Sequence, residues 1–321
     1  MSRFSPSDTA LEGFRLTREK PLAVLVWAGL RLLYLAAHIA LFTMTRSGAV
    51  LAQLSTQPVN QTPDQAVKSL GLIGQAAPTL VAMIVLGLAF YAITSTAVLR
   101  AVLRPLDRAW FYLRVSIEEA RQLGLGVLIF GTFFLYAAVI EIVSYLLVGV
   151  AKGLGSAGLP LEILVIVGVV AAFIYPAVRL SIAPAMTFAD GKITLFRAAP
   201  VTKGQFWQIL GTFILALALA VVIGLLATVI FVLAAMALGA ASGGVTNLPA
   251  ALGAIMQPQG MSFSVIATPL GAAKVIFGAL LDTLLYTIMF APGAAIFREL
   301  TGRVGAPTTA AAAVKPGQPW G

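Results

Sequence analysis

Six long apolar runs constrain the fold of this chain more than any other feature of its sequence. A helix of about 20 apolar residues crosses a hydrocarbon core about 30 Å thick, and each run meets that length. Transmembrane β-strands would alternate apolar and polar residues over about ten positions, and these runs do not alternate. The sequence therefore predicts an all-α, polytopic transmembrane helical bundle. Its expected spans are residues 21–44, 79–99, 123–150, 161–186, 209–240 and 269–297.

The composition agrees with a membrane protein and excludes several soluble classes. Hydrophobic residues make up 60% of the 321 positions and charged residues 10%, whereas a typical soluble domain is about 25% charged. We therefore expect neither a soluble globular enzyme nor a disordered chain. The absence of cysteine excludes cysteine-ligated metal sites, and the single histidine, His38, argues against histidine-based ones. We expect no metal and no cofactor.

Lysine and arginine are distributed unevenly among the segments between the apolar runs. The positive-inside rule assigns the more basic side of a membrane protein to the cytoplasm, so we expect both termini there, in a bacterial inner membrane. The net charge of +9 then indicates topology and contact with anionic lipid headgroups, and nucleic acid is not an expected partner. The opposite side carries Arg46, Lys68 and Lys152. The cytoplasmic side carries Arg3, Arg15, Arg18, Lys20, Arg100, Arg104, Arg108, Arg114, Arg121, Lys192, Arg197, Lys203, Arg298, Arg303 and Lys315.

Three of the basic segments have the pattern of amphipathic helices that lie at a membrane surface. Residues 5–20 begin with Ser5 at an N-cap and Pro6 at the first helical position. Residues 103–122 and 190–200 repeat apolar residues at helical spacing opposite charged ones. Each segment precedes an apolar run, so we expect three units, each a cytoplasmic interfacial helix followed by a transmembrane hairpin.

The aromatic residues around these segments have two interpretations. In the first, they anchor the bundle at the lipid headgroups; in the second, the same surfaces dock a lipid or a protein partner. Thr202 and Gln205 have the spacing of a capping box that begins the fifth run. The expected anchors are Trp110, Tyr112, Phe206 and Trp207.

The rest of the chain supplies connections rather than a separate enzyme domain. Residues 45–78 are polar and rich in glutamine, and residues 241–268 contain glycine, proline and methionine but no charge. We expect a single membrane domain over residues 1–303. Residues 304–321 are of low complexity and are expected to form a disordered cytoplasmic tail.

Ionisable residues inside the apolar runs are the candidate functional groups, because a charge within a bilayer is energetically expensive. Helix depth at about 1.5 Å per residue predicts that Arg31 meets Asp282, and that Glu141 meets Lys274. In one interpretation these pairs only join helices. In the other they belong to a polar cavity or relay. The secondary polar candidates are Tyr34, His38, Tyr145, Arg179 and Tyr286.

Catalytic motifs do not accompany these residues. The sequence has no His-Glu-x-x-His pattern, no P-loop and no pair of aspartates within the runs. We therefore expect a protein that is not an enzyme. The leading hypothesis is an integral membrane scaffold or accessory protein that handles lipid or assists an envelope process, with an unidentified protein partner. The alternative is a small transporter or channel subunit that uses the buried ionisable residues.

Two stretches of the sequence support a family resemblance. They are residues 10–22 (ALEGFRLTREKPL) and 179–186 (RLSIAPAM), the latter followed by residues 202–210 (TKGQFWQIL). The chain resembles bacterial six-span inner-membrane proteins related to the membrane domain that accompanies some glycerophosphodiester phosphodiesterases. The resemblance implies the six-span layout. It does not imply phosphodiesterase activity, because this sequence has no counterpart of the soluble domain with its acidic metal site.

Overall fold

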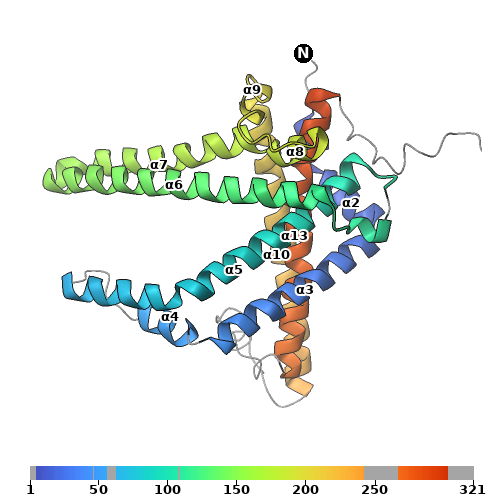
Figure 1. Cartoon of the computed structure of the whole chain (residues 1–321), viewed down its shortest axis with the longest axis horizontal. Helices are drawn as coiled ribbons and strands as arrows, with labels where there is room; N and C mark the ends of the chain where they lie inside the picture. Colours follow the sequence, from blue (N-terminus) through green and yellow to red (C-terminus); the bar gives the residue numbers. More distant parts are fainter. Residues whose placement is uncertain (1–4, 46, 56–62, 108, 242–266, 303–321) are drawn as a thin grey trace, which may run out of the picture. The chain divides into compact units, whose positions relative to one another are not determined.

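The computed structural model of the chain describes residues 5–45, 47–55, 63–107, 109–241 and 267–302. Every regular element in these ranges is a helix (Figure 1). Six helical stretches of the described chain are long and apolar enough to cross a membrane, in agreement with the six predicted runs. They are built on α3 (Pro21–Met44), α5 (Pro63–Leu103), α6 (Ile117–Gly153), α7 (Leu159–Leu180), α10 (Phe206–Ala241) and α13 (Pro269–Thr301).

Shorter helices lie before and between these six. Two precede α3, one follows it, and the rest are found at the ends of α6, α7 and α10. They are α1 (Pro6–Ala10), α2 (Glu12–Glu19), α4 (Ser47–Ser55), η1 (Ala109–Tyr112), η2 (Gly155–Gly158), α8 (Ala183–Asp190) and α9 (Ala198–Val201).

The chain divides into two compact units, each assembled from separated segments. The long helices α5, α10 and α13 pass from one unit into the other. Unit 1 consists of Met1–Leu16, Tyr91–Leu217 and Ile288–Gly321, and unit 2 consists of Thr17–Phe90 and Ala218–Thr287. The expected tail, residues 304–321, lies outside the described residues.

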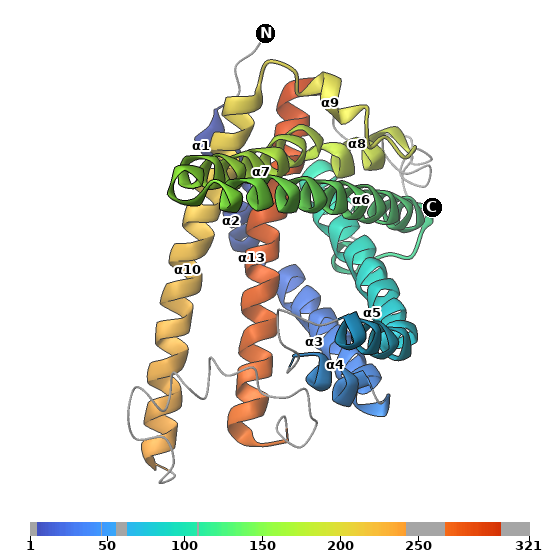
Figure 2. The same cartoon turned by 90° about the vertical axis from the view of Figure 1, so that its left-hand side faces the viewer.

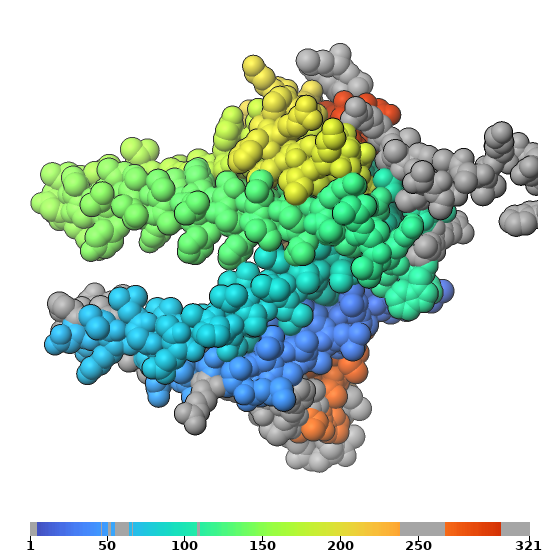
Figure 3. All heavy atoms as spheres, in the orientation of Figure 1, coloured from blue at the N-terminus to red at the C-terminus, as the bar shows by residue number. Residues whose placement is uncertain are grey.

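In unit 1, α6 and α7 form a helical hairpin closed by η2 (Figures 1 and 2). The Tyr136 hydroxyl donates a hydrogen bond to the carbonyl oxygen of Ala172 at 2.9 Å, and its ring meets the Phe173 ring edge-on. The outer faces are apolar: Phe134 is 65% and Leu146 62% exposed. Figure 3 shows side chains of α6 standing out along one side of the hairpin. Such faces suit contact with lipid acyl chains.

The segment after the hairpin is held onto it by two polar contacts. Helix α8 packs against α6, and α9 packs against α7. The buried Gln122 side chain of α6 donates through Nε2 to the carbonyl oxygen of Pro184 at 2.8 Å. The Thr202 hydroxyl donates to the carbonyl oxygen of Arg179 at 3.0 Å. The second bond satisfies a carbonyl group in the last turn of α7, where carbonyl groups lack intrahelical partners.

Residues from the beginning and the end of the described chain also meet in unit 1. Ser5 caps α1 as expected: its Oγ accepts a hydrogen bond from the backbone N–H of Asp8 at 3.5 Å. Glu12 in α2 forms an ion pair with Arg15 and a second one, at 3.5 Å, with Nη1 of Arg298 in α13. This carboxylate therefore links α2 to the last turn of α13.

Unit 2 is built from α3, α4 and the adjoining parts of α5, α10 and α13. The Ser47 hydroxyl donates to the Thr79 hydroxyl at 2.8 Å and ties α4 to α5. Phe231 of α10 and Phe277 of α13 stack with their ring centroids 4.3 Å apart. Within a bilayer the hydrophobic effect does not drive helices together. Side-chain stacking and interhelical hydrogen bonds are then the contacts expected to hold them.

The connection predicted over residues 45–78 is largely helical where the structure describes it. It contains α4 and the first turns of α5, which begins at Pro63 rather than near residue 79. Pro63 at the first helical position and Asp64 in the first turn both favour a helix start. The apolar run marked the hydrophobic part of α5 but not its beginning.

The fourth predicted span, residues 161–186, is interrupted. Helix α7 ends at Leu180, and α8 begins at Ala183 after a tight turn. Pro184 gives the physical reason. In a continuous helix its ring would clash with the carbonyl group of Leu180, and it has no N–H to donate to that group.

The prediction of one amphipathic helix over residues 103–122 is wrong. Helix α5 ends at Leu103, and Trp110, Phe111 and Tyr112 adopt positive φ angles of 36°, 58° and 66°. Helix α6 then begins at Ile117, after a capping box formed by Ser116 and Glu119. The apolar spacing resembled a helix, but Pro105 and this capping box separate two different helices.

The prediction of an amphipathic helix over residues 190–200 is also wrong. Gly191, with φ of 62°, ends α8 in the left-handed conformation, and an irregular segment leads to α9 at Ala198. The capping box expected from Thr202 does not begin α10. The Thr202 hydroxyl donates instead to carbonyl oxygens of Arg179, Ala198 and Ala199.

Candidate functional site

Arg31 and Asp282 meet in unit 2, near the middle of two apolar helices, with side chains that are 26% and 53% exposed. Nη2 of Arg31 in α3 lies 3.1 Å from Oδ2 of Asp282 in α13, within hydrogen-bond distance. The sequence analysis expected these two residues to meet from helix depth alone. A charge-assisted contact between them lowers the cost of placing either charge in hydrocarbon.

Aromatic rings complete the surroundings of the Arg31 guanidinium. Its carbon Cζ lies 5.1 Å from the Tyr34 ring centroid and 5.2 Å from that of Phe90. Those two rings stack on each other at 4.6 Å, and the His38 ring lies 5.5 Å from Tyr34. Cation–π contact of this kind is strongest where water is absent. The cluster thus joins α3, α5 and α13 through one cation.

The second expected pair, Glu141 and Lys274, is divided between the units. Glu141 lies on an exposed part of α6 in unit 1, and Lys274 lies in α13 in unit 2. Their pairing stays a prediction. Tyr145, one turn after Glu141, is 79% exposed on the same helical hairpin. Tyr286 follows Asp282 by one turn of α13.

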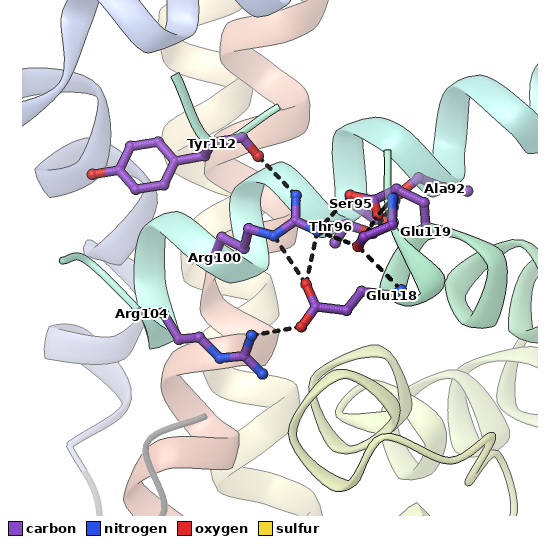
Figure 4. Close-up of polar contacts among 9 residues, drawn as sticks. Ala92, Ser95, Thr96, Arg100, Arg104, Tyr112, Glu118 and Glu119 are labelled. Carbon is purple, nitrogen blue, oxygen red and sulfur yellow. Dashed lines mark hydrogen bonds and ion pairs between the residues drawn. The ribbon is translucent and has the colours of Figure 1, made fainter. Parts of the chain in front are cut away.

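A buried ion network that sequence analysis did not identify lies between α5 and α6 (Figure 4). Arg100 is 1% exposed. Its Nε and Nη2 donate to Oε2 of Glu118 at 3.0 and 2.7 Å, and Nη2 pairs with Oε1 of Glu119 at 2.6 Å. Nη1 of Arg104 donates to Oε1 of Glu118 at 2.6 Å. Two cations and two carboxylates therefore neutralise each other.

The same network holds the irregular segment between the helices. Nη1 of Arg100 donates to the backbone carbonyl oxygen of Tyr112 at 3.0 Å, and Nη2 donates to the Ser116 hydroxyl at 3.1 Å. The Tyr112 hydroxyl donates to the carbonyl oxygen of Pro105 at 3.1 Å. Left-handed φ angles at residues other than glycine are unfavourable and persist where surrounding contacts hold them. These bonds supply such contacts.

The four expected interfacial anchors do not share one environment. Trp110 and Trp207 are 70% and 78% exposed, as residues facing lipid headgroups would be. Tyr112 is only 5% exposed and points into unit 1 rather than outward. Phe206 is half-buried, with its ring centroid 5.6 Å from that of Tyr175 in α7.

A partly open apolar cavity of about 280 Å³ lies among helices of unit 1. Five helices line it: α5, α7, α8, α10 and α13. Gly293 of α13 allows close approach here, because a Cβ atom at this position would lie 3.0 Å from the carbonyl oxygen of Ser181. The lining residues include Leu99, Val178, Pro184, Phe213, Phe290 and Ala294. An apolar lining of this kind suits an alkyl chain better than a polar solute.

Metal binding is not indicated within the described ranges. No group of three or more histidine, aspartate or glutamate side chains gathers there closely enough to hold an ion. The ionisable clusters described above consist of ion pairs.

Comparison with known proteins leaves the site to be interpreted from its geometry. No family model matches the chain, and neither the curated proteins nor the solved structures contain a match. The resemblance to membrane domains that accompany glycerophosphodiester phosphodiesterases therefore stays a prediction.

Proposed function

We propose that this chain is a non-enzymatic accessory or scaffold protein of the bacterial inner membrane that holds a membrane lipid in unit 1. The observation that carries this proposal is the cavity of about 280 Å³. Its apolar side chains offer dispersion contacts to an alkyl chain and few polar groups to orient a solute. Scaffold proteins of this kind act by holding lipid or protein, so no catalytic group is required.

Lipid retention in native-membrane nanodiscs tests the proposal. Mass spectrometry of the intact complex should find lipid that stays bound to the protein after bulk lipid is removed. Ala177 lines the cavity and is exposed, so Ala177→Leu should fill its entrance without disturbing the core. Ala171→Leu is the matched control, because Ala171 is also exposed on α7 and does not line the cavity. Equal lipid retention by all three proteins would contradict the proposal.

The proposal also assigns a topology, with both termini and the basic segments in the cytoplasm. The chain has no cysteine, so single introduced cysteines report accessibility directly. Lys192→Cys should react with a membrane-impermeant maleimide only in opened cells. Ser156→Cys, at the exposed η2 turn, should react from the outside of intact spheroplasts.

A second candidate function, a small transporter or channel subunit, is favoured by one observation. The Arg31–Asp282 pair, at 3.1 Å, places two ionisable groups among apolar helices of unit 2. Proteoliposomes that carry equal amounts of folded wild type or Asp282→Asn should then show solute or proton flux with the wild type only. Identical flux through wild type and Asp282→Asn would remove this candidate.

A protein partner is part of the accessory role. Extraction in native-membrane nanodiscs should co-purify a stoichiometric protein partner. Mass spectrometry of the sample used for the lipid measurement would identify it. The α6–α7 hairpin, with its extensive exposed apolar surface, is the surface that we would cross-link first.

A further inference from the structure

We infer that the lipid held in unit 1 is a phospholipid with an anionic headgroup. Its acyl chain occupies the apolar cavity, and its phosphate lies against the cations on either side of α9. This inference rests on the proposed function and specifies its ligand. Three observations within unit 1 support this inference. They are the level of the cavity below the expected membrane surface, the attachment of the cationic segment to α7, and the charge of that segment.

The cavity lies at acyl-chain depth below an interfacial residue. Trp207 is 78% exposed near the start of α10, and tryptophan at such a position marks the membrane–water interface. Phe213, which lines the cavity, follows six residues later, about 9 Å deeper along the helix. Leu99, which also lines the cavity, lies one turn before the end of α5. A lipid whose headgroup lies at the level of Trp207 would have the first part of its chain at this depth.

A hydrogen bond holds the segment that carries the cations on the end of α7, beside a residue that lines the cavity. Val178 lines the cavity, and the next residue, Arg179, accepts a hydrogen bond at its carbonyl oxygen from the Thr202 hydroxyl at 3.0 Å. Thr202 is completely buried, so this turn is firmly seated on the end of α7. Lys203 follows directly and is exposed, and Arg197 is exposed at the start of α9.

The segment that carries these cations is complementary to an anion at a membrane surface. Between Gly191 and Gln205 it contains three basic residues and no acidic residue. Its exposed apolar side chains, Ile193 at 48% and Phe196 at 64%, suit insertion among lipid chains. Lysine and arginine close to an anionic lipid surface each contribute about 1 kcal/mol, or about fivefold in binding. A neutral lipid would forgo that attraction.

The experiment compares two phospholipids that differ only in headgroup. Nanodiscs containing equal amounts of phosphatidylglycerol and phosphatidylcholine with identical chains are used with the full-length protein. Intact-complex mass spectrometry then counts the retained lipid of each kind. Four proteins are compared: wild type, Arg197→Gln/Lys203→Gln, Ala177→Leu and the charge control Lys152→Gln, whose lysine is exposed at the other end of α6.

Wild type should prefer phosphatidylglycerol, and the double variant should lose about 25-fold of that preference while still retaining lipid. Lys152→Gln should keep the preference, and Ala177→Leu should retain little lipid of either kind. Lipid retained without headgroup preference by wild type, or a preference unchanged in the double variant, would overturn the inference and leave the proposed function standing. Absence of retained lipid from wild type would overturn both. Thermal unfolding in detergent verifies that each variant is folded.

Discussion

The Arg100 guanidinium and the Glu118 carboxylate, 2.7 Å apart between Nη2 and Oε2, connect the last turn of α5 to the first turn of α6. Both residues are largely withdrawn from solvent, with side-chain exposures of 1% and 11%. Breaking a buried ion pair leaves an uncompensated charge, which is more costly than the pair itself is stabilising. The chain between the two helices therefore depends on this contact for its conformation.

Replacing Arg100 should destabilise unit 1 severely. Arg100→Met leaves Glu118 and Glu119 facing each other without the central cation, at a cost of about 3–5 kcal/mol. The expected result is a large drop in the thermal unfolding midpoint in detergent, together with low abundance in the membrane. Arg114→Gln is the control, because Arg114 is exposed and such a surface change alters stability by about 0.5 kcal/mol or less. Equal midpoints for the two variants would show that the network does not hold the segment.

The Arg31–Asp282 contact predicts non-additive substitutions. Arg31→Leu or Asp282→Leu alone leaves one unpaired charge among apolar helices, at a cost of about 2.5–3.5 kcal/mol. The double variant removes both charges and should recover most of the lost stability. Unfolding midpoints of the four proteins of this double-mutant cycle measure the coupling. Additive losses, with no recovery in the double variant, would disprove a direct interaction.

Two glycines of α13 should respond in opposite directions to the same substitution. Gly293→Ala places a Cβ atom 3.0 Å from the Ser181 carbonyl oxygen, so it should destabilise by about 1–3 kcal/mol. Gly278→Ala meets nothing within 4 Å and should stabilise the helix by up to about 1 kcal/mol. Thermal unfolding in one detergent compares both. A neutral Gly293→Ala would indicate that α13 and the α7–α8 turn separate easily.

The α6–α7 hairpin offers a conservative test of one interhelical hydrogen bond. Tyr136→Phe removes the hydroxyl that donates to the Ala172 carbonyl oxygen at 2.9 Å. Interhelical hydrogen bonds in membranes contribute about 0.6 kcal/mol on average, so a loss of that order is expected. Tyr145→Phe, at a side chain that is 79% exposed, should change nothing. The free energy of unfolding, measured by detergent-induced unfolding in mixed micelles, resolves such a difference. Equal effects of the two variants on this free energy would contradict the role of the Tyr136 hydroxyl.

Sequence reasoning was most successful where one simple physical quantity decides the outcome. The length of an apolar run predicts a helix long enough to cross a membrane. Five of the six runs lie within such stretches, and the fifth in chain order, residues 209–240, extends three residues past its stretch at Ala237. Counting depth from two helix ends brought Arg31 and Asp282 together, because a rise of about 1.5 Å per residue applies to any straight helix. Both predictions needed only one-dimensional information.

It failed where several local signals competed. The segment from Arg104 to Ser116 has apolar residues at helical spacing, yet Pro105 and the capping box at Ser116 override that spacing. The Ser116-x-x-Glu119 pattern was readable in the sequence and would have placed the start of α6. The cavity was beyond sequence reasoning, because its walls come from five helices brought together by tertiary packing.

The ion pair between Glu12 and Arg298 has a consequence for the order in which the protein is made. Its two residues are separated by nearly the whole chain, and unit 1 contains both. At about 5–20 residues per second, synthesis reaches Arg298 roughly 15–60 s after Glu12. During that interval Glu12 has its partner Arg15 within α2 but not Arg298. Unit 1 can therefore be completed only late in synthesis, after α13 has been made.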